Sequence, residues 1–223
     1  MQTKLAASVK ETALGQEADE ILRRCVHCGF CTATCPTYQI LGDELDSPRG
    51  RIYLIKEMLE GKPVTKTTQT HLDRCLTCRN CETTCPSGVE YGKLIDIGRQ
   101  MVDQHIERPL AERFKRQALR QTMNASWFAP AYRMGQMVRK WLPTPIQKKV
   151  VAKQSKGQLP ATTAHHPRQV LMLNGCVQPG MMPNIDAATI RVLDKVGIGS
   201  QVLAQSGCCG ALNFHLDAQE QAR

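Results

Sequence analysis

Apolar residues recur every three or four positions over much of the first half of the chain, which is the spacing of an amphipathic helix. Ser47 followed by Pro48 is typical of a helix start, because serine caps the first turn and proline fits its backbone. Gly61 is typical of the end of that helix. The pattern therefore predicts four helices in this half, at residues 10–24, 48–60, 66–74 and 89–106.

The pattern changes twice in the second half. A helical segment interrupted by prolines is followed by a polar stretch with proline and glycine but no periodicity, which is typical of a linker. After it, a strand at 170–173, a helix at 184–196 and a strand at 201–204 predict a βαβ unit with parallel strands. We therefore expect a mainly α chain that ends in a small α/β region, with three parts: residues 1–107, 108–168 and 169–223.

Composition agrees with a folded protein. The 223 residues are 42% hydrophobic and 22% charged, which excludes a disordered chain. No apolar run reaches the roughly 18 residues of a membrane span, and the first residues contain no secretion signal. We expect a cytoplasmic protein, either free or peripheral on the inner face of the cell membrane.

The net charge of +9 is concentrated in one segment. Residues 108–168 carry thirteen Lys and Arg against one acidic residue, and they include Trp127 and Trp141. A basic, aromatic segment of this kind packs on its own protein with a solvated face, docks on a partner subunit, or lies on an anionic membrane. Nucleic acid is the least favoured of these partners.

The eleven cysteines carry most of the chemical information. Ten of them lie in tight groups, which favours metal binding in a reducing compartment over a disulfide framework. The spacing Cys-x2-Cys-x2-Cys-x3-Cys-Pro begins at Cys25 and recurs at Cys75, fifty residues later. This is the spacing with which bacterial ferredoxins hold 4Fe–4S clusters.

In that arrangement the first three cysteines of each copy surround one cluster, and the fourth completes the other cluster. The two copies would then be tied together, and this half would fold poorly without metal. Hydroxyls of nearby threonines, at positions 32, 34, 77, 83 and 84, are expected to donate hydrogen bonds to sulfur. The predicted ligand sets are Cys25, Cys28, Cys31 and Cys85 for cluster 1, and Cys75, Cys78, Cys81 and Cys35 for cluster 2.

Zinc is the alternative for this repeat, since two Cys-x2-Cys pairs bind it tetrahedrally. A zinc site accounts for four cysteines. It does not account for two copies of a motif in which four cysteines and a proline follow one another with ferredoxin spacing. His27 and His71 lie near the repeat and are expected to be loop or surface residues.

A second cysteine group follows the strands of the βαβ unit. Cys176 follows the first strand in Asn174-Gly175-Cys176, and Cys208 and Cys209 follow the second strand between glycines. The carboxyl ends of parallel strands meet at one sheet edge, where open α/β sheets bind ligands. We expect these three thiols to face a cofactor, with inert buried cysteines or a redox-active thiol pair as alternatives.

The stretch CVHCGFCTATCPTYQILGDELDSPRGRIYLIKEMLEG, followed by HLDRCLTCRNCETTCPSGVEYGKLIDIGR, resembles the iron–sulfur subunits of glycolate oxidase (glycolate dehydrogenase). Their relatives include the iron–sulfur subunits of anaerobic glycerol-3-phosphate dehydrogenase and lactate utilisation proteins. Cys176 with Cys208-Cys209-Gly210 is similar to the cysteine-rich, CCG-type domain of that wider group. Family members are longer, so the resemblance implies a chain truncated within this domain.

The resemblance implies an α-helical ferredoxin-like domain with two 4Fe–4S clusters, a basic helical segment and an incomplete cysteine-rich domain. It implies an electron carrier in an oxidoreductase complex: flavoprotein subunits holding FAD oxidise a 2-hydroxy acid, and the electrons pass toward a quinone-type acceptor. A further iron–sulfur centre at the cysteine-rich domain is an additional expectation.

The residues themselves agree with a carrier, because no nucleotide-binding glycine motif and no acid–base or nucleophile constellation occurs. No catalytic residue is therefore predicted on this chain. The alternatives are the corresponding subunit for glycerol-3-phosphate or lactate and, from another class, a zinc-binding nucleic-acid or scaffold protein.

Overall fold

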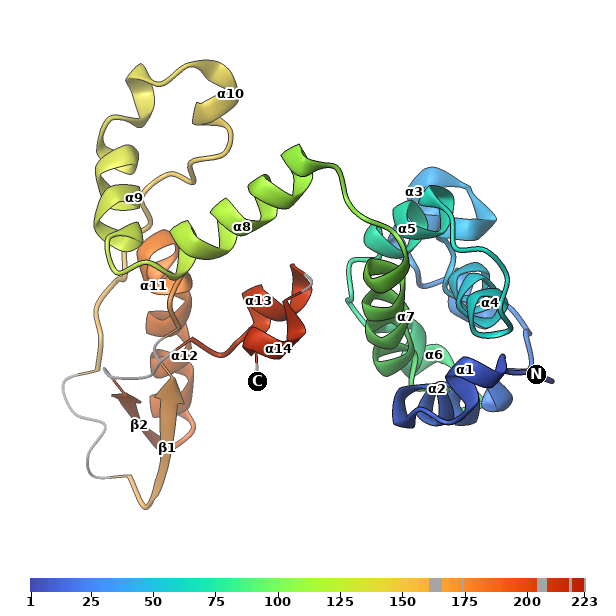
Figure 1. The fold of residues 1–223 in the computed structure, drawn as a ribbon. Helices are drawn as coiled ribbons and strands as arrows, with labels where there is room; N and C mark the ends of the chain where they lie inside the picture. Colours follow the sequence, from blue (N-terminus) through green and yellow to red (C-terminus); the bar gives the residue numbers. More distant parts are fainter. Residues whose placement is uncertain (161–165, 174, 204–207, 217, 223) are drawn as a thin grey trace. The chain divides into compact units, whose positions relative to one another are not determined.

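The computed structural model describes most of the chain: residues 1–160, 166–173, 175–203, 208–216 and 218–222. Within these residues the protein is mostly helical, with one two-stranded parallel sheet (Figure 1). The chain forms two compact units, Met1–Pro109 and Leu110–Arg223, each of which is described by itself. The division into three parts, with its boundaries after residues 107 and 168, stays a prediction.

The first unit contains helices at all four predicted places, joined by short helices around the cysteines. The cap of α4 is the one that the sequence indicates: the Ser47 hydroxyl accepts a hydrogen bond from the Gly50 N–H at 2.9 Å. Pro48 stands in the first turn, and the chain leaves the helix at Gly61 with a φ of +88°. The helices are α1 (Ala7–Lys10), α2 (Ala13–Arg24), α3 (Pro36–Leu41), α4 (Pro48–Leu59), α5 (Lys66–Asp73), α6 (Asn80–Thr84) and α7 (Tyr91–His105), with 3-10 turns η1 (Phe30–Thr32) and η2 (Glu44–Asp46).

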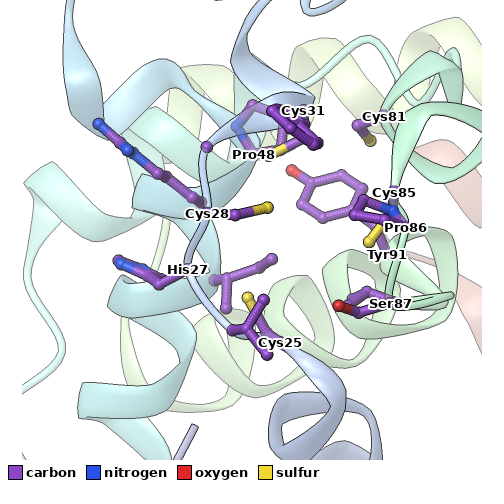
Figure 2. A pocket seen from close by; sticks show the side chains of 16 residues that line it. Cys25, His27, Cys28, Cys31, Pro48, Cys81, Cys85, Pro86, Ser87 and Tyr91 are labelled. Carbon is purple, nitrogen blue, oxygen red and sulfur yellow. The ribbon is translucent and has the colours of Figure 1, made fainter.

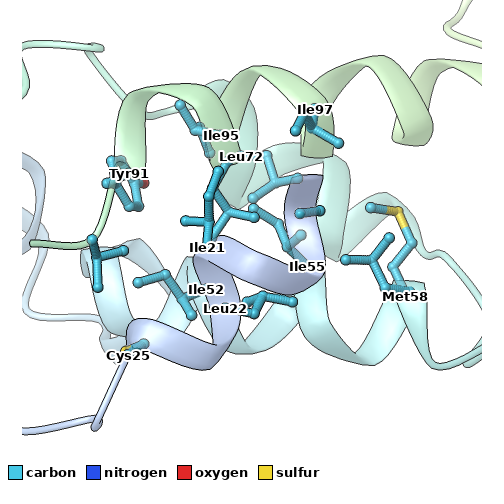
Figure 3. Packing of buried hydrophobic residues seen from close by; sticks show 14 of the residues in the cluster. Ile21, Leu22, Cys25, Ile52, Ile55, Met58, Leu72, Tyr91, Ile95 and Ile97 are labelled. Carbon is cyan, nitrogen blue, oxygen red and sulfur yellow. The ribbon is translucent and has the colours of Figure 1, made fainter. Parts of the chain in front are cut away.

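Helix α7 is the centre of this unit, with α2, α4 and α5 packed against it. Ile21 of α2, Ile55 of α4 and Ile95 of α7 meet in one buried apolar cluster (Figure 3). At Gly98 the helices approach closely, because a Cβ there would lie 2.7 Å from the Ile55 side chain. Two of the predicted metal ligands, Cys25 and Cys81, belong to the same cluster, so the core continues directly into the cysteine loops.

The second unit begins with the basic helical segment. Where prolines interrupt the sequence the structure has several short helices in place of one long helix. Among the described residues, no helix of the chain combines the length and the apolar character needed to cross a membrane. The segment contains α8 (Leu110–Asn124), α9 (Phe128–Met137), η3 (Arg139–Trp141) and α10 (Thr144–Gln147).

The predicted βαβ unit is present, with parallel strands. Strand β1 (Arg168–Leu173) pairs with β2 (Ile198–Leu203) in the register Arg168 to Ile198, and α12 (Pro183–Lys195) connects the strands and packs on β2. Short helices α11 (Gln178–Met181), α13 (Ala211–His215) and α14 (Gln219–Ala222) complete the unit. Residues 153–160 of the predicted linker have no helix or strand, whereas residues 161–165, Asn174, Ala204 and Gly207 lie outside the described residues.

Candidate metal centres

The two cysteine repeats have the same backbone conformation as well as the same spacing. His27 and Thr77, at equivalent positions, both have left-handed φ angles, of 59° and 54°. Two residues further on, Gly29 and Arg79 are left-handed as well, at 87° and 59°. This conformation is unfavourable for residues with a side chain, most of all for a β-branched threonine, and it concentrates at functional sites. Such turns also point successive N–H groups into a concavity that suits an anion or an iron–sulfur cluster.

One cavity, of about 420 Å³, lies against the first cysteine loop. Cys25, Cys28 and Cys31 contribute to its wall from that loop. Cys85 and Pro86 approach from the second repeat (Figure 2). The fourth cysteine of one repeat therefore lies beside the first three of the other.

A second cavity, of about 290 Å³, has the reciprocal composition. Cys75 and Cys78 of the second loop line it, together with Cys35 and Pro36 of the first repeat. Cys81 lines both cavities, and so does the ring of Tyr91. The structure thus brings all eight cysteines of the repeat to two adjacent cavities.

Three thiols of these cavities resist ionisation without a cation. Burial raises the pKa of Cys31 to about 11, and neighbouring cysteines add to the increase. Burial, reinforced by Cys75 and Cys31, raises the pKa of Cys81 to about 12, and burial also raises the pKa of Cys25. These three buried thiols become thiolates more readily beside compensating positive charge, which a metal centre supplies. The donor set therefore fits iron–sulfur clusters.

Hydrogen bonds to sulfur come from a backbone amide, as expected for this kind of loop, and from two side chains that the sequence did not single out. Tyr91 donates from its hydroxyl to Cys75 Sγ at 3.6 Å, and the backbone N–H of Thr77 donates to the same sulfur at 3.5 Å. The Thr37 hydroxyl lies 3.2 Å from Cys35 Sγ. No periodicity or spacing in the sequence indicated Tyr91 or Thr37.

The prediction is wrong for four of the five threonine hydroxyls. Those of residues 32, 34, 83 and 84 donate to backbone carbonyls, and the hydroxyl of Thr77 lies 3.4 Å from Arg99 Nη1 and accepts from it. In short turns a threonine hydroxyl reaches the carbonyl three or four residues earlier more readily than a sulfur. The Thr34 hydroxyl also lies 3.4 Å from the Asn80 carbonyl oxygen and so links the two repeats.

A buried charge network lies behind the second cavity. The carboxylate of Asp46 is inaccessible to solvent and receives Arg51 Nη2 at 3.2 Å, His71 Nδ1 at 2.9 Å and Arg74 Nη1 at 2.9 Å. Burial alone would raise the pKa of Asp46, but the hydrogen bonds from His71 and Arg74 hold it below its usual value. Arg51 itself is 1% exposed, and its Nη1 lies 4.0 Å from Cys35 Sγ.

The prediction that His71 is a loop or surface residue is also wrong. His71 lies in α5 and is buried, because its ring bonds to Asp46, whereas His27 is an exposed loop residue as expected. The residues next to His71 in the sequence gave no sign of a partner 25 positions away.

The second cysteine group is assembled at the carboxyl edge of the small sheet. Cys176 Sγ lies 3.9 Å from Cys208 Sγ, and both sulfurs contact Asn124 Oδ1, at 3.8 Å and 3.4 Å. The Gly210 N–H donates to Cys208 Sγ at 3.4 Å. Burial raises the pKa of Cys176, with further increases from Cys208 and Cys209. All three thiols are exposed, and Asn124, at the end of α8, was not predicted to join them.

Comparison with known proteins agrees with both cysteine groups. Residues 21–89 match the 4Fe-4S dicluster domain, and residues 170–223 match the cysteine-rich domain. The chain is 56% identical over 222 residues to the glycolate oxidase iron-sulfur subunit of Escherichia coli (strain K12), covering 99% of this chain and 54% of that protein. Over 99% of its length the chain is thus similar to a glycolate oxidase iron–sulfur subunit.

A second similar protein is more distant. The probable glycolate oxidase iron-sulfur subunit of Bacillus subtilis (strain 168) is 31% identical over 225 residues, covering 87% of this chain and 50% of that protein. The chain spans about half the length of these curated relatives. No solved structure matches it. The dicluster match supports two 4Fe–4S clusters in the region of the two cavities.

The basic segment of residues 108–168 exposes apolar as well as charged side chains. Large apolar side chains are exposed along it, among them Phe114 at 74%, Met137 at 78% and Trp141 at 87%. They lie among the thirteen basic residues of 108–168. This combination suits contact with another surface.

Proposed function

We propose that the eight cysteines of the repeat bind two 4Fe–4S clusters crosswise. The support is the composition of the two cavities, in which Cys85 joins the first loop and Cys35 joins the second. Cys81 lines both cavities, and its place in the second repeat assigns it with Cys75 and Cys78. The Cys25 centre is Cys25, Cys28, Cys31 and Cys85; the Cys35 centre is Cys35, Cys75, Cys78 and Cys81.

On this basis the chain is the electron-transfer subunit of a complex that oxidises glycolate or a similar 2-hydroxy acid. The observation that carries the proposal is 56% identity to the Escherichia coli glycolate oxidase iron-sulfur subunit, together with the two cysteine-lined cavities. When bound, 4Fe–4S clusters supply one-electron carriers. The chain's own residues fix the ligands, exclude water and set the charge around them.

The partner is a flavoprotein that removes electrons from the hydroxy acid, and the acceptor is a quinone. The exposed apolar and basic side chains of residues 108–152 are the contact surface for a partner subunit or for the membrane that holds the quinone. Salt-sensitive sedimentation of the chain with anionic vesicles supports the membrane contact. Absence of binding at low salt leaves the partner subunit as the contact.

At the cysteine-rich domain, Cys176, Cys208 and Cys209 face a further cofactor. The support is the approach of two sulfurs to 3.9 Å at the sheet edge, beside an amide oxygen that bonds to both. Iron analysis of the intact chain and of its Cys176→Ser variant tests this role. Equal iron contents would contradict it.

The function is tested by reconstitution with the flavoprotein subunits. We expect co-purification, eight irons and eight sulfides for the two clusters of the repeat, and reduction of an artificial acceptor with glycolate. Parallel activity assays with lactate and glycerol-3-phosphate distinguish a glycolate dehydrogenase from the related dehydrogenases. A colourless protein containing zinc in place of iron would contradict the redox function.

A further inference from the structure

The two cavities differ in the side chains that bond to their sulfurs. At the Cys35 centre, Tyr91 donates to Cys75 Sγ, and the Thr37 hydroxyl contacts Cys35 Sγ. For the other centre, no side chain in the described part of the protein donates a hydrogen bond to a ligand sulfur. Its sulfurs bond to backbone groups, such as that of His27 at Cys25.

The cavities differ in buried charge as well. Arg51 and Arg74 both pair with the single carboxylate of Asp46, so the network has at least one positive charge in excess. The Arg74 side chain is 47% exposed, so the buried charge of the network is that of Arg51. Arg51 lines the second cavity, is 1% exposed and lies 4.0 Å from Cys35 Sγ. A charge so far from solvent is weakly screened, and its field extends to the cavity.

The first cavity has a cation of a different kind. Arg49 lines it, but the Arg49 side chain is 34% exposed and pairs with Glu44, which is 45% exposed. Water screens an exposed pair of this kind, and the carboxylate cancels the charge one for one. Beside Cys25 the N-terminal ammonium of Met1 donates to the Cys25 carbonyl oxygen at 2.7 Å. In the described part of the protein, however, no guanidinium contacts a sulfur of that centre as Arg51 contacts Cys35 Sγ.

Reduction adds a negative charge to a cluster. Nearby positive charge and hydrogen bonds to its sulfurs stabilise the reduced state and raise the reduction potential. We propose that Tyr91 and Arg51 hold the reduction potential of the Cys35 centre above that of the Cys25 centre. This inference rests on the crosswise ligation given under the proposed function.

The two residues act in different ways. Tyr91 is 4% exposed and its ring lines both cavities, but its hydroxyl bonds to a ligand of one centre only. Arg51 acts through its charge, and Asp46 holds its guanidinium in place. With both clusters bound, the Cys35 centre would therefore accept the first electron from a reductant such as dithionite, with no bond made or broken.

The test for Tyr91 is an EPR-monitored redox titration of the intact chain with both clusters present. Tyr91→Phe removes the hydroxyl and keeps the ring. We expect about a tenfold decrease in the reduction equilibrium constant of the Cys35 centre, which is 59 mV for a one-electron couple, and no change at the Cys25 centre. The control, Tyr132→Phe in the second unit, removes a hydroxyl that bonds to the Val151 N–H and should change neither potential.

The test for Arg51 compares variants that keep its charge with a variant that removes it. Arg51→Lys keeps the charge and should hold the potential near that of the natural chain. Asp46→Asn combined with Arg51→Gln changes the pair to neutral side chains of similar size. The double variant also removes the carboxylate that offsets Arg74, so it is compared with Asp46→Asn alone. These two variants differ only at residue 51, and Asp46→Asn, which keeps the Arg51 charge, should have the higher potential at the Cys35 centre.

Two results would overturn the inference while leaving the proposed function intact. One is a full iron and sulfide content with equal potentials for the two centres. The other is a change of reduction potential in Tyr91→Phe that is confined to the Cys25 centre. The EPR signal of the Cys25 centre is the one that Cys85→Ser alters. Absence of the clusters themselves would instead contradict the proposed function.

Discussion

Arg51 Nη2 lies 3.2 Å from Asp46 Oδ1, and both side chains are almost completely buried beside the second cysteine cavity. The pair joins the start of α4 to the turn before it, and His71 and Arg74 attach α5 to the same carboxylate. The network thus fixes three segments behind the sulfur of Cys35. Its removal should affect stability as well as potential.

Asp46→Ala should lower the free energy of unfolding by about 3–5 kcal/mol, because it leaves the Arg51 charge buried without its carboxylate. The control is Glu57→Ala, which removes an exposed pair with Lys62 and should cost at most about 1 kcal/mol. Urea unfolding followed by circular dichroism under anaerobic conditions measures both. Equal effects of the two variants would contradict the structural role of the network.

Thr77 holds a left-handed φ of 54° in the second cysteine loop, which is unfavourable for a β-branched residue. Thr77→Gly should raise stability by about 1 kcal/mol relative to Thr77→Val. Both variants lose the hydroxyl that accepts from Arg99, so the comparison isolates the backbone. Thermal unfolding of the iron-loaded proteins provides the measurement, and a less stable glycine variant would show that the turn is not strained.

Two glycines in helices offer a matched test of the core. A Cβ at Gly98 would lie 2.7 Å from Ile55, whereas nothing lies within 4 Å of a Cβ at Gly135 in α9. Gly98→Ala should therefore destabilise the protein by about 1–3 kcal/mol through overpacking. Gly135→Ala should stabilise its helix by up to about 1 kcal/mol. Stabilisation of similar size at both positions would show that α4 and α7 have room to separate.

Removal of iron should unfold part of the first unit. Cys25 and Cys81 belong to its hydrophobic cluster, and the proposed ligands join segments about fifty residues apart. Anaerobic chelation should therefore reduce the helical circular dichroism signal, and iron with sulfide should restore it. An unchanged signal after complete loss of iron would mean that the helices need no metal.

The sequence predicted the elements whose signals are local. Ser47 and Pro48 marked the start of α4, apolar spacing marked α7, and the cysteine spacing marked the metal region. The parallel pairing of β1 with β2 followed from the helix predicted between them. Each of these features depends on residues close together in the chain.

Features made by distant residues could not be predicted in this way. His71 is buried because Asp46 lies 25 positions earlier, and Asn124 reaches Cys208 across 84 positions. The threonine hydroxyls had two local choices, sulfur or carbonyl, and the turn geometry that decides between them appears only in three dimensions. Tyr91 became a candidate only when α7 placed its hydroxyl at Cys75.

The crosswise ligation is tested most directly by comparing Cys85→Ser with Cys35→Ser. EPR spectra of the two reduced proteins, with iron and sulfide analysis, show which centre each variant alters. Cys85→Ser should alter the centre held mainly by residues 25–31, and Cys35→Ser should alter the centre held mainly by residues 75–81. The reverse assignment, with each variant altering the centre of its own repeat, would contradict the account.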